Sequence, residues 1–167
     1  MPEIRKASIH DAEKIIEYCK IIGAETDNLS FGAEGLSVTV EQEQAFLETI
    51  NASNQQLFLV AVSDGELVGT ASFMGFPKPR LAHRAEISIS VKKSMWGQHI
   101  GSRFMEELLR FAKEVANVSV LSLEVRSDNE RAIALYKKFG FETIGTFDGF
   151  MHINGNDISY DIMRLSL

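Results

Sequence analysis

Apolar and polar side chains alternate along several short segments of the chain, which is the pattern of a strand that buries one face. The period of two is most regular around Glu86, Ser88 and Ser90, which alternate with apolar residues. The pattern predicts strands over residues 4–6, 57–62, 66–76, 82–91, 119–126, 143–152 and 158–165. Short turn sequences at Ser63–Gly65 and Asn154–Asn156 separate two neighbouring pairs of these segments, which predicts two hairpins.

Other segments carry apolar residues at helical spacing. They predict four helices, over about 8–23, 39–50, 99–116 and 127–139. Gly23 and Gly140 follow the last periodic residues of the first and fourth helix, so they are expected to end those helices. The third helix is expected to bury one stripe, formed by Ile100, Phe104, Leu108, Phe111 and Val115. Residues 24–38 show no clear period, which predicts a loop.

The predicted elements follow one another in the order β-α-α-β-β-β-α-β-α-β-β. This order indicates an α/β fold built on a mixed sheet that is antiparallel in its first half. The chain has no internal repeat and no linker-like segment, so we expect a single domain over residues 1–167.

Composition narrows the class of protein. The 167 residues are 45% hydrophobic and 24% charged, which is typical of a globular chain rather than a disordered one. No apolar run reaches the roughly 18 residues of a membrane helix, and the first residues lack a signal-peptide core. A cytoplasmic protein without membrane contact is therefore expected. The net charge of −6 argues against a nucleic-acid partner.

The chain offers little for a metal site or for cysteine chemistry. Cys19 is the single cysteine, and its place on the apolar face of the first helix predicts a core residue rather than a nucleophile. The histidines are scattered without metal-ligand spacing, at positions 10, 83, 99 and 152. We therefore expect no metal cofactor.

Charge is unevenly distributed along the chain. Residues 24–48 carry six carboxylates and no Lys or Arg, namely Glu25, Asp27, Glu34, Glu41, Glu43 and Glu48. Residues 92–114 hold five basic and three acidic side chains. The first region would attract a cation and the second would tolerate an anion, although ordinary solvated faces produce the same pattern.

A glycine-containing loop between the strand that ends at Val91 and the third helix is a candidate anion site. Gly97 and Gly101 let the backbone approach a ligand, and amides at a helix start are free to bind phosphate oxygens. No Lys-Ser/Thr pair follows, so the loop is not a nucleoside-triphosphate P-loop. No third glycine or acidic ribose ligand follows either, which excludes a dinucleotide fingerprint. A plain turn is the alternative.

A second informative string runs from Asn129 to Phe141 and matches N-x-x-A-x-x-L-Y-x-x-x-G-F throughout. The glycine loop keeps the last glycine of the pattern Q/R-x-x-G-x-G/A at Gly101, but has Trp96 and His99 at the first and fourth positions. Together these segments resemble those of the GNAT (GCN5-related) N-acetyltransferases. The resemblance covers essentially the whole chain and implies a mixed, mostly antiparallel central sheet flanked by about four helices.

The resemblance implies acetyl-CoA as co-substrate. In the family, the backbone of the strand before the loop pairs with the pantetheine arm, which here means Ile89, Ser90 and Val91. The loop amides hold the diphosphate, which assigns this role to Gly97, Gln98, His99, Ile100, Gly101 and Ser102. Asn129 stands at the position of a side-chain contact to CoA.

The resemblance also implies catalytic residues. Tyr136 stands where the family's tyrosine protonates the departing thiolate, and a phenol of pKa ~10 suits a thiol of pKa ~8.5. The attacking amine must lose a proton, and two carboxylates on polar strand faces are candidates for the base. Glu124 lies in Leu-Glu-Val-Arg-x-x-Asn, which resembles the ribosomal-protein N-terminal alanine acetyltransferases. Glu86 resembles the base of histone-acetylating members. Either glutamate would alternatively face solvent.

The function implied is direct transfer of an acetyl group to a primary amine, with the oxyanion held by a backbone amide near Val91. A small cationic amine, an amino-acid-like metabolite and a peptide N-terminus all remain open as acceptors. A non-catalytic acyl-CoA-binding sensor and a purely structural protein are the alternatives from other classes. A homodimer is compatible with the resemblance, but the sequence shows no interface.

Overall fold

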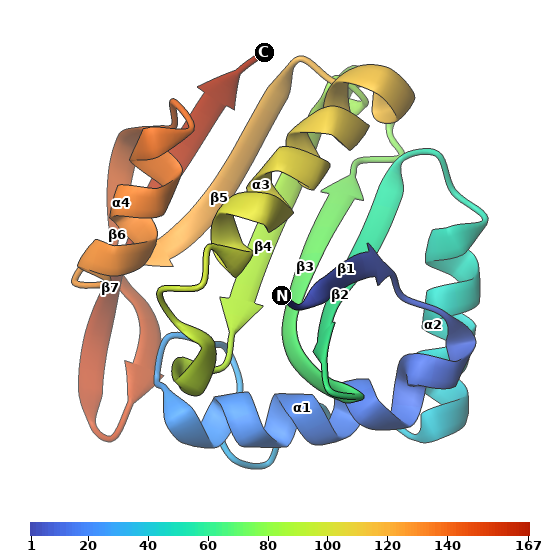
Figure 1. Cartoon of the computed structure of the whole chain (residues 1–167). Helices are drawn as coiled ribbons and strands as arrows, with labels where there is room; N and C mark the ends of the chain where they lie inside the picture. Colours follow the sequence, from blue (N-terminus) through green and yellow to red (C-terminus); the bar gives the residue numbers. More distant parts are fainter.

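The computed structural model describes residues 1–167, and its seven strands form one sheet in the order β1-β2-β3-β4-β5-β7-β6 (Figure 1). The strands are β1 (Glu3–Lys6), β2 (Gln56–Ser63), β3 (Glu66–Gly75), β4 (Arg84–Val91), β5 (Val120–Arg126), β6 (Glu142–Ile153) and β7 (Asn156–Ser166). The helices are α1 (Ala12–Glu25), α2 (Val40–Asn51), α3 (Ile100–Phe111) and α4 (Glu130–Lys138). The element order predicted from the sequence is confirmed.

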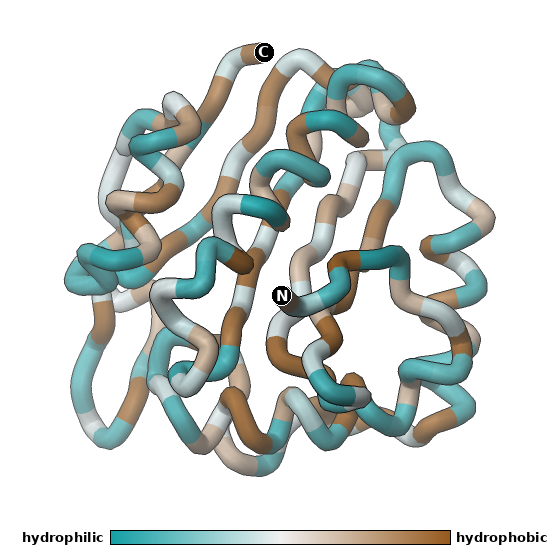
Figure 2. Tube along the Cα trace, in the orientation of Figure 1, coloured by the Kyte–Doolittle hydropathy of each residue, from teal (hydrophilic) through white to brown (hydrophobic).

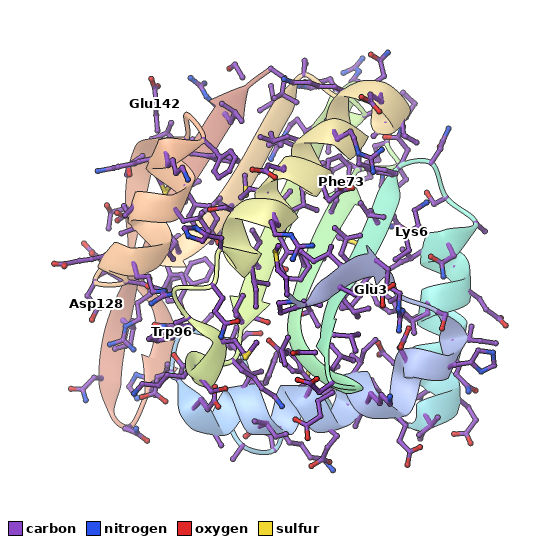
Figure 3. All side chains as sticks on the ribbon, viewed as in Figure 1. Glu3, Lys6, Phe73, Trp96, Asp128 and Glu142 are labelled. Carbon is purple, nitrogen blue, oxygen red and sulfur yellow. The ribbon has the colours of Figure 1, made fainter.

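The sheet separates two apolar cores. Adjacent strand residues point to opposite faces, so Ala61 packs with the residues of α3 and α4 while its neighbour Val60 packs with those of α1 and α2. Phe73 of β3 is fully buried and meets Phe111 of α3 edge-on, with the ring centroids 5.1 Å apart (Figure 3). Apolar stretches follow the central strands, and apolar and polar residues alternate around the helices (Figure 2). None of the helices has the length and apolar character needed to span a membrane.

The sheet opens between β4 and β5. Strands β1 to β4 are antiparallel neighbours, whereas β4 and β5 are parallel and pair only over Arg84–Glu86 and Val120–Ser122. Both strands continue beyond this short ladder, β4 to Val91 and β5 to Arg126, without further pairing to each other. The two strands therefore diverge, and the backbone edges that they expose form the inner walls of the site.

The end of the third helix differs from the prediction. The α-helix stops at Phe111 and continues as one π turn over Ala112–Ala116. A π turn holds more residues than an α turn, so the buried stripe moves by one position. Ala116 is buried in consequence, and Val115, expected in the stripe, is 46% exposed.

Gly23 does not end the first helix, which continues to Glu25. Its role is steric, because the following loop crosses directly over it. A Cβ on Gly23 would lie 1.9 Å from the carbonyl oxygen of Gly32. The missing side chain lets the 26–38 segment fold back against α1, and this segment then walls the site.

Substitution of Gly23 by Ala is therefore expected to lower the free energy of unfolding by roughly 1–3 kcal/mol, the usual cost of overpacking. Urea denaturation of the wild type and the variant measures this change in the free energy of unfolding. Gly145→Ala is the matched control, because no atom lies within 4 Å of its Cβ position and its φ is not positive. Equal unfolding midpoints for the two variants would contradict the close approach.

Candidate active site

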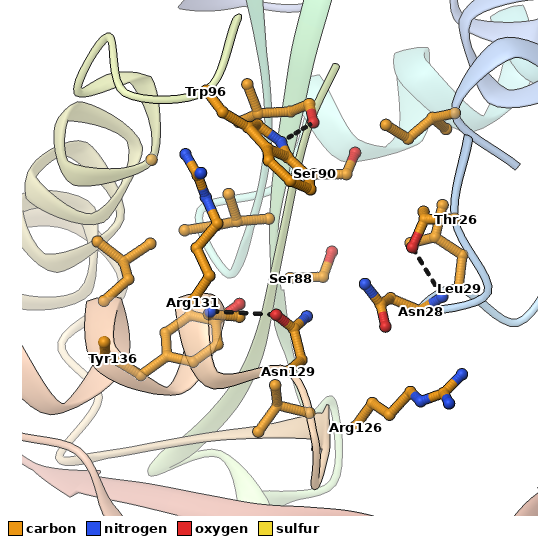
Figure 4. A pocket seen from close by; sticks show the side chains of 18 of the residues that line it. Thr26, Asn28, Leu29, Ser88, Ser90, Trp96, Arg126, Asn129, Arg131 and Tyr136 are labelled. Atoms are coloured by element: carbon orange, nitrogen blue, oxygen red, sulfur yellow. Dashed lines mark hydrogen bonds between the residues drawn. The ribbon is translucent and has the colours of Figure 1, made fainter. Parts of the chain in front are cut away.

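A cavity of about 740 Å³ occupies the gap between β4 and β5 (Figure 4). It is lined by the last residues of both strands, the loop before α3, the inner side of α4 and the hairpin of β6 and β7. The end of α1 and the segment after it close the remaining side, with Glu25, Thr26, Asn28, Leu29 and Ser30. The cavity thus passes from the α3–α4 side of the sheet to the α1 side.

The edge of β4 that faces the cavity has unpaired backbone groups. The amide of Lys92 donates to the carbonyl of Val68 in β3. Because backbone groups alternate in direction along an antiparallel ladder, Ser90 also faces β3, while Ile89 and Val91 turn their amides into the gap. Two of the three predicted backbone contacts are therefore open to a ligand, and the backbone of Ser90 is not.

The glycine loop beside the cavity has a row of amides without a partner in the protein. From Gly97 to Ser102, six consecutive N–H groups donate to no acceptor in the protein, since the first amide bonded at this end of α3 is that of Arg103. Gly97 has a φ of +80° and His99 a φ of +59°. His99 therefore adopts the left-handed conformation that glycine adopts freely, which costs a residue with a side chain about 1–2 kcal/mol. The loop has the shape of an anion site.

Trp96 and Arg131 form a stacked pair at the end of this loop. The indole Nε1 of Trp96 donates to the carbonyl of Val91 at 2.9 Å, which fixes the ring against β4. The guanidinium of Arg131, from the first turn of α4, lies 4.3 Å from the centroid of that ring. Arg131 lines the cavity but was not predicted as a site residue, since no sequence spacing links α4 to the loop.

Asn129 caps α4 and lines the cavity. Its Oδ1 accepts a hydrogen bond from the amide of Ala132 at 3.2 Å (Figure 4). The amide group of the same side chain makes no hydrogen bond within the protein and remains free for a ligand.

Tyr136 is held deep on the α4 wall of the cavity. Only 6% of it is exposed, and its ring packs against Phe141 at a centroid distance of 5.9 Å. Burial raises the pKa of the Tyr136 hydroxyl to about 12. With that pKa the hydroxyl is protonated at neutral pH, and because it makes no hydrogen bond within the protein it is available as a donor in the cavity.

The two candidate bases differ in position. Glu124 lines the cavity, whereas Glu86 does not. Both lie on the same face of the sheet, because Glu86 is in register with Ser122, two residues before Glu124. Partial burial, followed by the negative charge of Glu86, raises the pKa of Glu124. Of the two candidate bases, Glu124 is therefore the one inside the cavity, and Glu86 lies outside it.

The wall opposite α4 is polar, and hydrogen bonds connect the end of α1 and the segment after it to the loop after β4 and to β7. Glu25 accepts from the amide of Lys93 at 2.9 Å, and Tyr160 donates to the carbonyl of Asn28 at 3.1 Å. Arg126 lines the cavity with its guanidinium bound to Asp128. Of the six carboxylates in residues 24–48, only Glu25 lines the cavity, so most of that acidic segment lies elsewhere.

Other candidate residues are outside the site. Cys19 is buried in the core of α1, as predicted, and burial raises its pKa to about 11. Gln98, predicted as a loop contact to the cofactor, does not line the cavity, and its side chain donates to the sulfur of Met95. No three His, Cys, Asp or Glu side chains are grouped so that they would hold a metal ion.

Comparison with known proteins identifies similar chains. Residues 25–141 match the model of the acetyltransferase (GNAT) family. The chain is 34% identical over 113 residues to the N-alpha-acetyltransferase RimI of Mycobacterium tuberculosis, a match that covers 68% of each chain.

Solved structures share the architecture. An acetyltransferase of the GNAT family from Streptococcus pneumoniae superposes with a TM-score of 0.95 at 26% identity, over 100% of this chain and 99% of that one. The yncA protein of Salmonella typhimurium, a putative acetyltransferase solved with its cofactor acetyl-CoA, has a TM-score of 0.85 at 21% identity. That match covers 100% of this chain and 94% of the yncA chain.

Proposed function

Since this chain belongs to the GNAT acetyltransferase family and has its fold, we propose that it transfers the acetyl group of acetyl-CoA directly to a primary amine of a cationic acceptor. Membership makes it an acetyl-CoA-dependent N-acetyltransferase. The observation that carries the rest is the cavity between β4 and β5, which joins free loop amides, Tyr136 and Glu124 in one space.

The acetyl donor, acetyl-CoA, fits the α3–α4 side of this cavity. The amides of Gly97–Ser102 have no protein partner and would bind the diphosphate, as amides at a helix start bind phosphate. The free amides of Ile89 and Val91 would pair with the pantetheine arm and hold the oxyanion that develops on the thioester carbonyl. The side-chain amide of Asn129 would bind a carbonyl of the same arm.

Glu124 is the proposed base. An ammonium has no lone pair to attack with, so a carboxylate must first take its proton, directly or through water. Glu124 is the glutamate of the candidate pair that lines the cavity, and its raised pKa makes it a stronger base than an exposed carboxylate. Glu86 assists from outside, because its negative charge contributes to that raised pKa.

Tyr136 is the proposed acid. The amine nitrogen forms a bond to the carbonyl carbon, and collapse of the tetrahedral intermediate breaks the carbon–sulfur bond. Tyr136 then gives its proton to the departing thiolate, which leaves as the thiol of CoA, and regains a proton from solvent. The proton taken first from the ammonium stays with Glu124 until solvent removes it, and the nitrogen of the intermediate loses its second proton to water as the amide forms. The transfer is direct, and the one cysteine, buried in a core outside the cavity, is not available to carry the acetyl group.

The charge on the α1 side of the cavity, where we place the acceptor amine, favours a cation. Glu25 and Glu124 line this part of the cavity, and Asp27 and Asp128 lie near the guanidinium of Arg126. This excess of carboxylates would attract an ammonium group and repel an anionic acceptor. A polyamine, an amino-group-bearing metabolite and a peptide N-terminus all meet this requirement.

Release of free thiol from acetyl-CoA, measured against a panel of amines, tests the proposal. The panel should contain diamines and polyamines, free amino acids and short peptides with a free N-terminus. We expect turnover with at least one cationic acceptor and none with the matching N-acetylated compound. Binding of CoA without turnover of any amine would contradict the proposal and favour a sensor of acyl-CoA.

A further inference from the structure

The guanidinium of Arg131 is a basic group at the glycine loop that the protein leaves without a hydrogen-bond or ion-pair partner. It makes no hydrogen bond and no ion pair in the structure, although its residue lines the cavity. Two other basic side chains near the loop are engaged: Lys92 pairs with Glu66, and Arg103 donates to the carbonyl of Pro2. The five N–H donors of Arg131 are therefore available to a ligand.

Trp96 holds this guanidinium in place. The ring is fixed by its hydrogen bond to Val91, and Arg131 stacks on the ring at 4.3 Å (Figure 4). A stacked guanidinium keeps its edge N–H groups free, and these match the geometry of phosphate oxygens. Trp96 therefore removes much of the freedom that an exposed arginine would lose on binding an anion.

The stacked pair lies beside the six free amides of Gly97–Ser102. Trp96 directly precedes these amides in the chain, and Arg131 and five of the six loop residues line the same cavity. Amides and the helix terminus carry only partial charge, whereas a diphosphate carries about two negative charges. The protein as a whole is acidic, at −6, so a local full positive charge matters for an anionic ligand.

We propose that Arg131, pre-positioned on Trp96, binds the diphosphate of CoA together with the loop amides and so contributes to affinity for acetyl-CoA. This role rests on the proposed function, since it requires CoA in the cavity. It concerns donor affinity alone and assigns Arg131 no part in acetyl transfer.

Calorimetric titration with CoA, in the absence of any acceptor, tests the role. Arg131→Ala is expected to raise the Kd about 10-fold to 100-fold, the range for loss of a hydrogen bond to a charged group. Arg131→Lys keeps the charge but not the planar fork, so it should restore only part of the affinity. Lys137→Ala is the matched control, because it removes the same charge from α4 at a residue outside the cavity.

Two further measurements distinguish a diphosphate contact from a contact with the 3′-phosphate and from a structural role of Arg131. A titration with 3′-dephospho-CoA should show the same loss for Arg131→Ala, since the diphosphate is still present. The affinity of this variant should also fall less steeply with salt than that of the wild type, because one ionic contact is gone. A merely structural role would leave the salt dependence unchanged.

Three results would overturn the assignment. One is an Arg131→Ala Kd that matches that of Lys137→Ala. Another is a loss seen with CoA but not with 3′-dephospho-CoA, which would move the contact to the 3′-phosphate. The third is an unchanged salt dependence. Failure of the wild type to bind CoA at all would instead contradict the proposed function itself.

Discussion

Replacing Tyr136 by Phe is expected to lower kcat by about 10²-fold or more, while the Kd for acetyl-CoA changes by less than about twofold. The ring contributes to packing against Phe141 and is retained in the variant. Only the hydroxyl is lost, and it makes no hydrogen bond that the fold requires. Burial raises the pKa of this hydroxyl to about 12, so the wild-type group is protonated and ready to donate throughout the physiological range.

Steady-state kinetics with the best acceptor and calorimetry with CoA separate the two quantities. Tyr18→Phe is the control, because Tyr18 is buried in the α1 core and does not line the cavity; its hydroxyl is bonded to Ser90 of β4. Its kcat should stay within about twofold of the wild-type value. An unchanged rate for Tyr136→Phe would remove the hydroxyl from the mechanism.

Replacing Glu124 by Gln is expected to lower kcat/KM by about 10²-fold to 10⁴-fold, the usual contribution of a general base. Gln has the same shape but cannot accept the ammonium proton. Rates should be measured across pH, since the loss should diminish when the acceptor amine is itself deprotonated in solution. Activity retained at neutral pH would contradict the assignment of Glu124.

Glu86→Gln is the matched control, because it removes a neighbouring carboxylate outside the cavity. The negative charge of Glu86 contributes to the raised pKa of Glu124. Without that charge the pKa of Glu124 should fall, so the acidic limb of the kcat/KM profile should move to lower pH. A loss as large as that of Glu124→Gln would instead make Glu86 the base.

Fold class and the position of the glycine loop were predictable because their signals are local. Period-two and helical spacing, capping sequences and turn glycines report the conformation of the few residues that contain them. The string from Asn129 to Phe141 was expected to lie in a helix that carries Tyr136, and the structure has this helix as α4, with Tyr136 lining the cavity. The loop from Trp96 to Ser102 was likewise recognisable from neighbouring glycines.

The departures from the glycine pattern became interpretable only in the structure. His99 occupies the left-handed conformation in which glycine is unstrained, so the loop keeps its shape without the glycine. Trp96 is fixed on Val91 and stacks with Arg131, which comes from a helix 35 positions later in the chain. A pattern confined to one segment cannot encode a contact between two segments.

The sequence alone determined the order of elements, the glycine loop and the helix that carries Tyr136, because each depends on residues close together in the chain. Tertiary structure decided which glutamate enters the cavity, since that depends on where β4 and β5 stop pairing. It also decided that Gly23 serves close approach rather than helix termination, and that the π turn exposes Val115. These outcomes follow from packing between remote segments, which local periodicity does not contain.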